Sequence, residues 1–428
     1  MKVFPESWII CPADTVCSAI IDCLNKTAPV VEQDTGFRMI RTTNVRHGRV
    51  NMEDNRFVEE AVFNKWSRRA RLKRGDIILS REAPLGEVGL LRSDGKAFLG
   101  QRTMLYRADP QKLDQHYLYY QMIGPYVQAV IHGQGQGSTV AHLRVPDAET
   151  LPIPVAPLPA QRKIAAVLAA YDDLIEANRR RISLLERMAE EIYREWFVRL
   201  RFPGHATTKI TKGIPAGWDI RPFSDVVEIN PTERIDKEEE RPFVAMEELS
   251  ESSMYFTHHE RRKGHVGPKF RNGDVLFPRI TPSVENGKRG LVMTLADGEV
   301  AQGSTEFIVL REKVLTTEHI YFLSVSEGFR TNAELSMTGA SGRQRVQEQC
   351  FTQFLVKTPP PALREKFTAI VRPMVSQIRL LSIQTEALTR TRDLLLPRLI
   401  SGKLPVEALP IAFPPSVMDS AVATPISG

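Results

Sequence analysis

Residues 160–198, AQRKIAAVLAAYDDLIEANRRRISLLERMAEEIYREWFV, predict a helix of about 57 Å at about 1.5 Å per residue, since no glycine or proline interrupts them. Asn178 takes one position of its apolar seam, where a polar residue commonly fixes register and partner choice. Arg179, Arg180 and Arg181 lie off the seam and form either a solvated face or a partner contact. The apolar residues recur in alternating steps of four and three, which is typical of a coiled coil: Ile164, Leu168, Tyr171, Ile175, Ile182, Leu185, Ala189, Ile192 and Trp196.

A second long helix is predicted over residues 362–396. We expect Pro373 to kink it, because proline removes a backbone donor, and Pro397 and Gly402 to end it. Two long helices with apolar seams in one chain most simply pack on each other, and an antiparallel arrangement lets each carry its own globular domain. The apolar stripe of this second helix comprises Phe367, Ile370, Met374, Ile378, Leu381, Leu388 and Leu395.

The chain also repeats itself. RGDIIL at 74–79 returns as NGDVLF at 272–277, and an arginine follows each, Arg81 and Arg279. Further echoes occur in the same order, which indicates a duplication: Trp8 with Trp218, QRT at 101–103 with QGST at 302–305, the glycine-rich 133–139 with 339–342, and PLPAQR at 157–162 with PPPALR at 359–364.

The fold class predicted from these patterns is α+β, with two mixed, strand-rich domains separated by two long antiparallel coiled-coil helices and related as an internal repeat. The predicted boundaries follow the helices and the echoes: a first domain at 1–158, a central helix at 159–200, a linker at 201–214, a second domain at 215–358, a C-terminal helix at 359–405 and a disordered tail at 406–428.

Composition restricts the class of protein. The 428 residues contain 57 Lys plus Arg against 51 Asp plus Glu, a net charge of +6. This balance suits a polyanionic partner, although an ordinary basic surface gives the same number. The four cysteines have no zinc-ligand spacing, and we find neither a secretory signal nor an apolar run long enough to span a membrane. We therefore expect a cytoplasmic protein.

Several motifs resemble those of a known family. LLLPRLISGKL at 394–404 resembles the C-terminal signature of type I restriction–modification specificity subunits, and EWFV at 195–198 with Pro203 resembles the end of their central conserved region. GDIILSREAP at 75–84 with GEV at 86–88, and GDVLFPRITP at 273–282 with ENGK at 285–288, resemble two subtypes of the recognition domain in that family. The resemblance extends from Trp8 to Leu404.

The resemblance implies a non-catalytic DNA-specificity subunit. Each variable domain would read one half of an asymmetric bipartite target in double-stranded DNA. The helices would set the spacer and dock two methyltransferase subunits, and motor–nuclease subunits would join to complete the complex. Adenine methylation and restriction would then belong to the partners, together with S-adenosylmethionine, ATP and Mg²⁺, so this chain is expected to hold no cofactor, no metal and no catalytic residue.

Candidate DNA-contacting residues follow from charge and from the repeat. Lys and Arg contact phosphates, while Arg and Asn can pair with base edges, and a solvated surface is the alternative for each. Arg81 and Arg279 rank first because they occupy matched positions after a strand. The first-domain candidates are Arg41, Asn44, Arg68, Arg69, Lys73, Arg81, Arg102, Ser138 and Thr139, and the second-domain candidates are Arg261, Arg262, Lys269, Arg279, Thr281, Asn286, Lys288 and Arg343.

Catalytic alternatives lack their motifs. Asn230-Pro231-Thr232 does not complete the Asn-Pro-Pro-aromatic loop of a DNA methyltransferase, and no phosphate-binding Gly-x-x-x-x-Gly-Lys-Ser/Thr loop is present. Two rival interpretations stay open. One is a fused or unusual restriction enzyme with activity in this chain, and the other is a coiled-coil scaffold without a DNA role.

Overall fold

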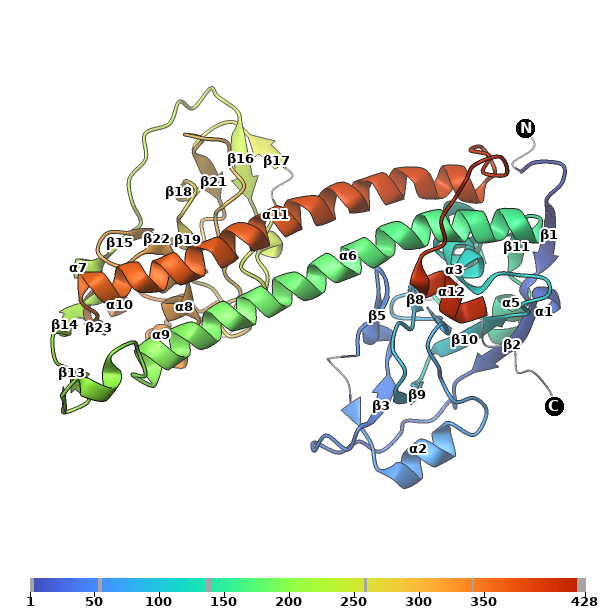
Figure 1. Ribbon diagram of the computed structural model, residues 1–428, viewed down its shortest axis with the longest axis horizontal. Helices are drawn as coiled ribbons and strands as arrows, with labels where there is room; N and C mark the ends of the chain where they lie inside the picture. The colour runs from blue at the N-terminus through green and yellow to red at the C-terminus, as the bar shows by residue number, and fades with distance from the viewer. Residues whose placement is uncertain (1–3, 53–55, 135–140, 258–259, 341, 422–428) are drawn as a thin grey trace. The chain divides into compact units, whose positions relative to one another are not determined.

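The computed structural model describes residues 4–52, 56–134, 141–257, 260–340 and 342–421 (Figure 1). The chain forms two compact units. Unit 1 comprises Met1–Ile175 and Ala387–Gly428, and unit 2 comprises Glu176–Glu386. Each unit therefore contains a strand-rich body together with part of each long helix.

The long helices are α6, Leu158–Tyr193, which continues as a π-helical turn over Arg194–Val198, and α11, Pro361–Ile400. In unit 1 the start of α6 packs on the end of α11, where Asp172 Oδ1 accepts a hydrogen bond from Arg392 Nη1 at 2.7 Å. In unit 2 the end of α6 packs on the start of α11, and the rings of Phe197 and Phe367 lie 4.9 Å apart. The helices are thus antiparallel in both units, as predicted, and Asn178 is buried.

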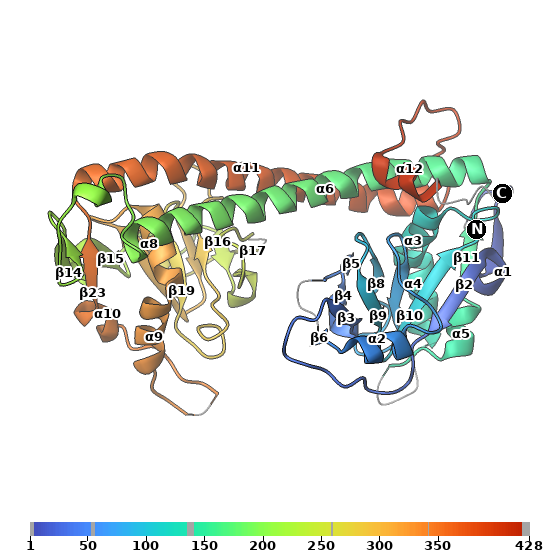
Figure 2. The same ribbon diagram turned by 60° about the horizontal axis from the view of Figure 1, so that its bottom comes forward.

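The body of unit 1 is a six-stranded sheet in the order β2-β10-β7-β8-β5-β4, which Figure 2 shows with α3, the helix that packs on it. Its strands are β2 Cys17–Asp22, β10 Thr103–Ala108, β7 Ile77–Ser80, β8 Val88–Leu90, β5 Gly48–Val50 and β4 Val45–Arg46. A smaller sheet contains β6 Arg56–Phe57, β3 Phe37–Ile40 and β9 Lys96–Leu99, and β1 Ile9–Pro12 pairs with β11 Pro152–Val155. The helical elements are α1 Ala13–Val16, the 3-10 turn Thr42–Asn44, α2 Glu60–Trp66, α3 Gln115–Ile123, α4 Pro125–Gln134 and α5 Val145–Glu149.

Unit 2 repeats this arrangement in the order β15-β22-β19-β20, which matches β2-β10-β7-β8 strand for strand. These strands are β15 Val227–Ile229, β22 Phe307–Glu312, β19 Val275–Pro278 and β20 Gly290–Leu291. The second sheet contains β17 Glu260–Arg262, β16 Arg241–Val244, β21 Ala301–Gly303 and β18 Lys269–Phe270, and β14 Asp219–Pro222 pairs with β23 Leu355–Thr358. The remaining elements are α7 Phe223–Val226, α8 Thr317–Val325, α9 Glu327–Leu335, α10 Gln349–Gln353, the 3-10 turns His205–Thr207 and Met246–Glu248, and the short hairpin β12 Ile210–Thr211 with β13 Ile214–Pro215.

One echo of the sequence does not match in three dimensions. Gln302 lies inside β21, whereas Gln101 follows the equivalent strand β9. The backbone hydrogen bonds show instead that Arg102 of unit 1 is equivalent to Glu306 of unit 2. The Arg102 carbonyl accepts the amide of Arg81, and the Glu306 carbonyl accepts the amide of Arg279, the arginine that follows the matching strand. The matching strand order of the two sheets, and not this sequence echo, is therefore the evidence for the duplication.

The end of the chain differs from the prediction in two places. Helix α11 continues through Pro373 and Pro397 to Ile400, and Gly402, at φ 71°, follows it. Burial of Leu399 and Ile400 in the core of unit 1 outweighs the backbone bond that Pro397 cannot make. Residues 415–421, within the segment predicted to be disordered, form α12, Pro415–Ala421. Ser416 Oγ donates to Asp173 Oδ2 at 2.6 Å and Val417 is buried, so local packing orders a segment whose composition suggested disorder.

Candidate nucleic-acid interface

A basic segment is exposed on the surface of unit 1 between α2 and β7. Arg68, Arg69 and Lys73 are all exposed there, and Arg71 and Arg74 are exposed between and after them. Lys65, at the end of α2, stacks over the Trp66 ring at 5.3 Å from its centroid. The arrangement can present several cations to a phosphate backbone at once.

Asp76 fixes the position of this segment. Its Oδ2 accepts the Lys73 backbone amide at 2.9 Å, and its carboxylate pairs with Arg107 of β10 at 2.6 and 2.7 Å. Gly75, at φ 90°, provides the left-handed turn that this contact requires. The basic segment is thereby anchored to the sheet at its C-terminal end.

Arg81, one of the two first-ranked candidates, was predicted to contact DNA, and the structure corrects this prediction. Its side chain is only 7% exposed and pairs with Asp22 Oδ1 at 2.8 Å. Its Nη1 also donates to the Leu143 carbonyl at 3.0 Å. The guanidinium therefore ties β7 to β2 and to the segment before α5 rather than facing solvent.

The remaining candidates of unit 1 divide by burial. Asn44 is 1% exposed and its Oδ1 accepts the Arg41 amide at 2.9 Å, so it closes a turn beneath a half-buried Arg41. This burial removes the Asn44 amide from the predicted set of base readers. Arg102 is half exposed and pairs with Glu82 at 3.1 Å. Ser138 and Thr139 lie outside the described residues.

In unit 2 two loops meet beyond the end of β19. Thr281 and Gln344 exchange backbone and side-chain hydrogen bonds of 3.1 and 3.2 Å, which brings the turn after Arg279 against the glycine-rich loop. Arg343 is exposed in that loop, and Arg279 is 26% exposed with Glu348 at 3.1 Å. The structure thus brings together Arg279, Thr281 and Arg343, three candidates from distant parts of the sequence.

The same 280–288 loop carries two more candidates. Asn286 is exposed and donates to Glu251 at 3.1 Å. Lys288 is half-buried, with its Nζ at 3.3 Å from the Met246 carbonyl. Each side chain thus makes a hydrogen bond to a neighbouring segment of unit 2, and the Asn286 side chain is the more accessible of the two.

The last three candidates lie in the second sheet of unit 2. Arg261 pairs with Glu299 at 3.0 Å, and Arg262 pairs with Glu260 at 2.7 Å and lies 3.6 Å from the Phe243 ring centroid. Lys269 is a second correction. It is buried at 4% exposure, and its Nζ donates to the Gly267 carbonyl at 2.6 Å. Burial lowers the pKa of Lys269, so this lysine closes a turn and is not a surface cation.

Sequence reasoning missed the carboxylates that accompany these cations. Glu306 pairs with Arg345 at 2.6 Å, and the pKa of Glu306 is lowered chiefly by the hydrogen bond from that guanidinium. Glu306 takes the place of Arg102 in the repeat, but its partner Arg345 takes the place of His142 and not of Glu82, so the two units form different ion pairs at this point. No local pattern announces such pairs, because their members come from separate segments.

Within the described ranges the chain shows no group of three or more His, Cys, Asp or Glu side chains placed to hold a metal ion. The helices that the structure describes are all too short or too polar to cross a membrane.

Comparison with known proteins gives concordant results. A family model described as "Type I restriction modification DNA specificity domain" matches residues 60–187. The MjaIX type I restriction enzyme specificity subunit of Methanocaldococcus jannaschii is 23% identical over 350 residues, covering 78% of this chain and 79% of that protein. The EcoAI specificity subunit of Escherichia coli is 29% identical over 170 residues, covering 37% and 28%.

A solved structure agrees at the level of the fold. The S subunit of a type I restriction–modification system from M. genitalium aligns with a TM-score of 0.56 at 14% identity, covering 92% of this chain and 96% of that one. The family match over residues 60–187, the relatives and the duplicated topology agree: the chain is similar to type I restriction–modification specificity subunits and has the fold of the solved S subunit.

Proposed function

We propose that this chain is the non-catalytic, DNA-reading subunit of a type I restriction–modification complex and that each unit reads one half of an asymmetric bipartite target. The observation that carries the proposal is one topology built twice with different exposed residues. Unit 1 exposes Arg68, Arg69 and Lys73 in the segment before β7, whereas unit 2 exposes Asn286 and Arg343 in loops that follow β19. A shared frame with unlike surfaces suits two unlike half-sites.

The partners follow from the family. Two methyltransferase subunits would dock on the long helices, and motor–nuclease subunits would complete the restriction complex. The helices would set the spacer between the half-sites. S-adenosylmethionine, ATP and Mg²⁺ would act in those partners, whose activity this chain directs toward methylation of adenine or toward cleavage.

The decisive experiment is to co-express the chain with its candidate methyltransferase and map methylated adenines across the host genome. A bipartite motif with two different halves is expected. Replacing residues 1–157 by the same region of a relative should change one half only. A motif whose two halves change together would contradict the assignment of one half-site to each unit.

A binding measurement addresses the rival interpretations. Purified chain should bind duplex DNA with an affinity that falls steeply with salt, and Arg68→Ala/Arg69→Ala/Lys73→Ala should reduce the slope by about three, the number of phosphate contacts removed. Arg187→Ala, at an exposed position on α6, is the matched control. Salt-independent or absent binding would favour the scaffold, and methylation or cleavage by the chain alone would favour the fused enzyme.

A further inference from the structure

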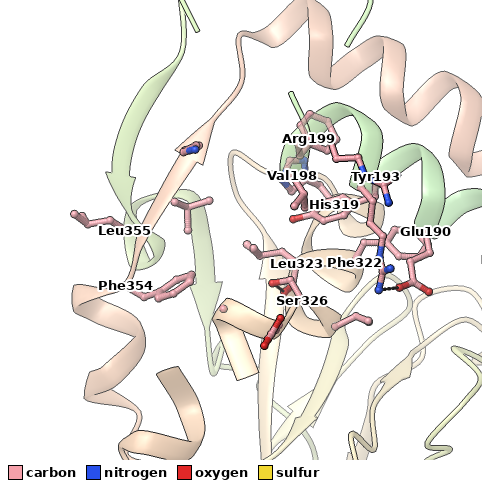
Figure 3. Close-up of a pocket in the computed structure, with 17 residues that line it drawn as sticks. Glu190, Tyr193, Val198, Arg199, His319, Phe322, Leu323, Ser326, Phe354 and Leu355 are labelled. Carbon is pink, nitrogen blue, oxygen red and sulfur yellow. Dashed lines mark hydrogen bonds and ion pairs between the residues drawn. The ribbon is translucent and has the colours of Figure 1, made fainter. Parts of the chain in front are cut away.

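Unit 2 contains a pocket of about 610 Å³ between the end of α6, the corner where α8 meets α9, and the start of β23 (Figure 3). Tyr193 of α6 and Val198 of the π-helical turn line it on one side, and His319 of α8, Ser326 at the corner and Leu355 of β23 line it on the others. Val198 is 58% and Leu355 is 62% exposed, so apolar surface continues outward from the pocket.

The repeat shows what fills the matched location in unit 1. Leu200 follows α6 and Gly402 follows α11, and both have a positive φ, 58° and 71°. Because these two residues are equivalent in the repeat, Val198, two positions before Leu200, is equivalent to Ile400, two positions before Gly402. The corner residue Gly124 aligns with Ser326, because each caps the helix before it, α3 or α8. Ile400 is only 3% exposed and lies so close to Gly124 that a Cβ there would collide with it. Unit 1 therefore closes with its own helix end the space that unit 2 leaves open.

Two tyrosines of unit 1 are also replaced by smaller residues. Tyr126 of α4 packs edge-on against Phe4 at 5.1 Å, and its counterpart in α9 is Gly328. Tyr117 of α3 donates its hydroxyl to the Pro154 carbonyl at 3.1 Å, and its counterpart in α8 is His319. Unit 2 thus lacks both tyrosine hydroxyls, has no ring in place of Tyr126, and has the smaller imidazole ring in place of the Tyr117 phenol.

His319 shows the consequence of this loss. The side chain is 2% exposed, yet its Nδ1 has no hydrogen-bond partner among the residues that the structure describes. Burial, with a smaller contribution from Arg364, lowers the pKa of His319 to about 3, so the imidazole is neutral at ordinary pH. A buried polar atom without a partner is costly, and a ligand group that pairs with it removes that cost.

We propose that this pocket receives the side chain of a tyrosine from a partner polypeptide, with the hydroxyl pairing with His319. Tyrosine fits because its ring replaces the missing aromatic volume and its hydroxyl can donate or accept, whichever tautomer the imidazole adopts. The exposed apolar rim favours a polypeptide over a free small molecule, since only a chain covers Val198 and Leu355 as well. The counterpart of Phe4 in unit 2, Ile214, already packs in the core of unit 2. The inference goes beyond DNA reading and does not depend on it.

The test uses the full chain and capped tripeptides. N-acetyl-Ala-Tyr-Ala-amide should bind saturably in calorimetry, and the Phe analogue should bind about tenfold more weakly because it cannot pair with His319. Gly328→Tyr should weaken binding of the Tyr peptide at least tenfold by filling the pocket. No described atom lies within 4 Å of a Cβ placed at Gly328, and the same holds at Gly133 of α4, so Gly133→Tyr is the matched control and should bind normally.

The possible results separate cleanly. Equal binding of the Tyr and Phe peptides would overturn the role of His319, and His319→Leu, once shown by its unfolding curve to be folded, should produce that equality. Binding of free p-cresol without binding of the tripeptide would overturn the polypeptide occupant, and binding of neither would overturn the site. DNA affinity measured on the Gly328→Tyr sample should be unchanged, so failure of the pocket and failure of DNA reading are distinguishable.

Discussion

At the scale of single residues, two aspartates hold the duplicated frame together. Asp76 pairs with Arg107, and Asp274 pairs with Arg311 at 2.8 and 2.7 Å while accepting the Arg271 amide at 2.8 Å. Both carboxylates are 1% exposed. A buried carboxylate is costly unless it is paired and hydrogen-bonded. The Gly-Asp turn before the strand is therefore fixed by the ion pair with the arginine as well as by the backbone conformation of the glycine.

We predict that Asp274→Ala lowers the free energy of unfolding of the chain by about 3 kcal/mol, because it leaves the buried Arg311 with Glu233 alone. Urea unfolding followed by circular dichroism measures the change. Asp297→Ala, at an exposed position of the same unit, is the control and should change the free energy of unfolding by less than about 0.5 kcal/mol. Equal effects of the two substitutions would contradict the role given to the buried pair.

Burial also divides the proposed DNA contacts. Arg343→Ala should weaken duplex DNA binding and lower the salt slope by about one, since an exposed cation that meets a phosphate is removed. Lys269→Met should leave the affinity unchanged, because the Lys269 ammonium is buried against backbone carbonyls. Fluorescence anisotropy at several salt concentrations compares the two, and a larger loss at Lys269 would reverse the assignment.

His319 predicts an acid sensitivity of the fold. Its pKa is lowered from 6.5 to about 3 in the folded chain, so the unfolded state takes up a proton below about pH 6.5 that the folded state does not. Stability is therefore lost as pH falls through that window. His319→Gln should show a smaller drop in unfolding free energy between pH 7 and pH 5 than the parent in urea unfolding at the two pH values, and an equal drop would contradict the role given to His319.

At the scale of elements, α12 shows how a short segment is ordered by what it touches. Lys163 of α6 donates to the carbonyls of Glu407 and Leu409 at 2.6 and 3.0 Å, and Ser416 then reaches Asp173. Val406 and Val417 are buried at 2% and 5% exposure. The last described part of the chain is thereby fastened along α6 within unit 1.

Truncation after Pro405 should therefore lower the unfolding free energy of unit 1 by about 1–2 kcal/mol and speed hydrogen exchange in α6 around Asp173. Truncation after Ala421 removes none of these contacts and serves as the control. Unchanged exchange in the shorter chain would show that α12 does not stabilise the helix it contacts.

At the scale of the whole molecule, the long helices belong to both units. Each passes from one compact unit into the other, between Ile175 and Glu176 in α6 and between Glu386 and Ala387 in α11. Within the proposed function this continuity makes the helices the determinant of spacer length.

We predict that removing one heptad from both helices, about 10 Å at 1.5 Å per residue, shortens the accepted spacer by about three base pairs without altering either half-site. Mapping methylated sites of the deletion variant with its methyltransferase measures this. Removing the heptad from α6 alone breaks the pairing with α11 and should abolish methylation. An unchanged spacer in the double deletion would refute the helices as its determinant.

The amino-acid sequence by itself determined the long helices, their antiparallel pairing and the duplication. Heptad spacing and recurring turn motifs can be recognised from residues that are close together in the sequence, so they predict these features without knowledge of the tertiary contacts. The basic segment at 68–74 was likewise predictable, because a run of cations cannot be buried and must lie at the surface.

Only the tertiary structure decided which candidates face solvent. Arg81 and Lys269 sit in basic or repeated motifs, yet Asp22 and the carbonyls of Val266 and Gly267 hold them inside. The open pocket beside His319 depends in the same way on the small residues that line it, among them Val198 and Gly328, which come from distant parts of the sequence. Burial is a property of segments brought together from distant positions, so no single stretch of sequence contains it.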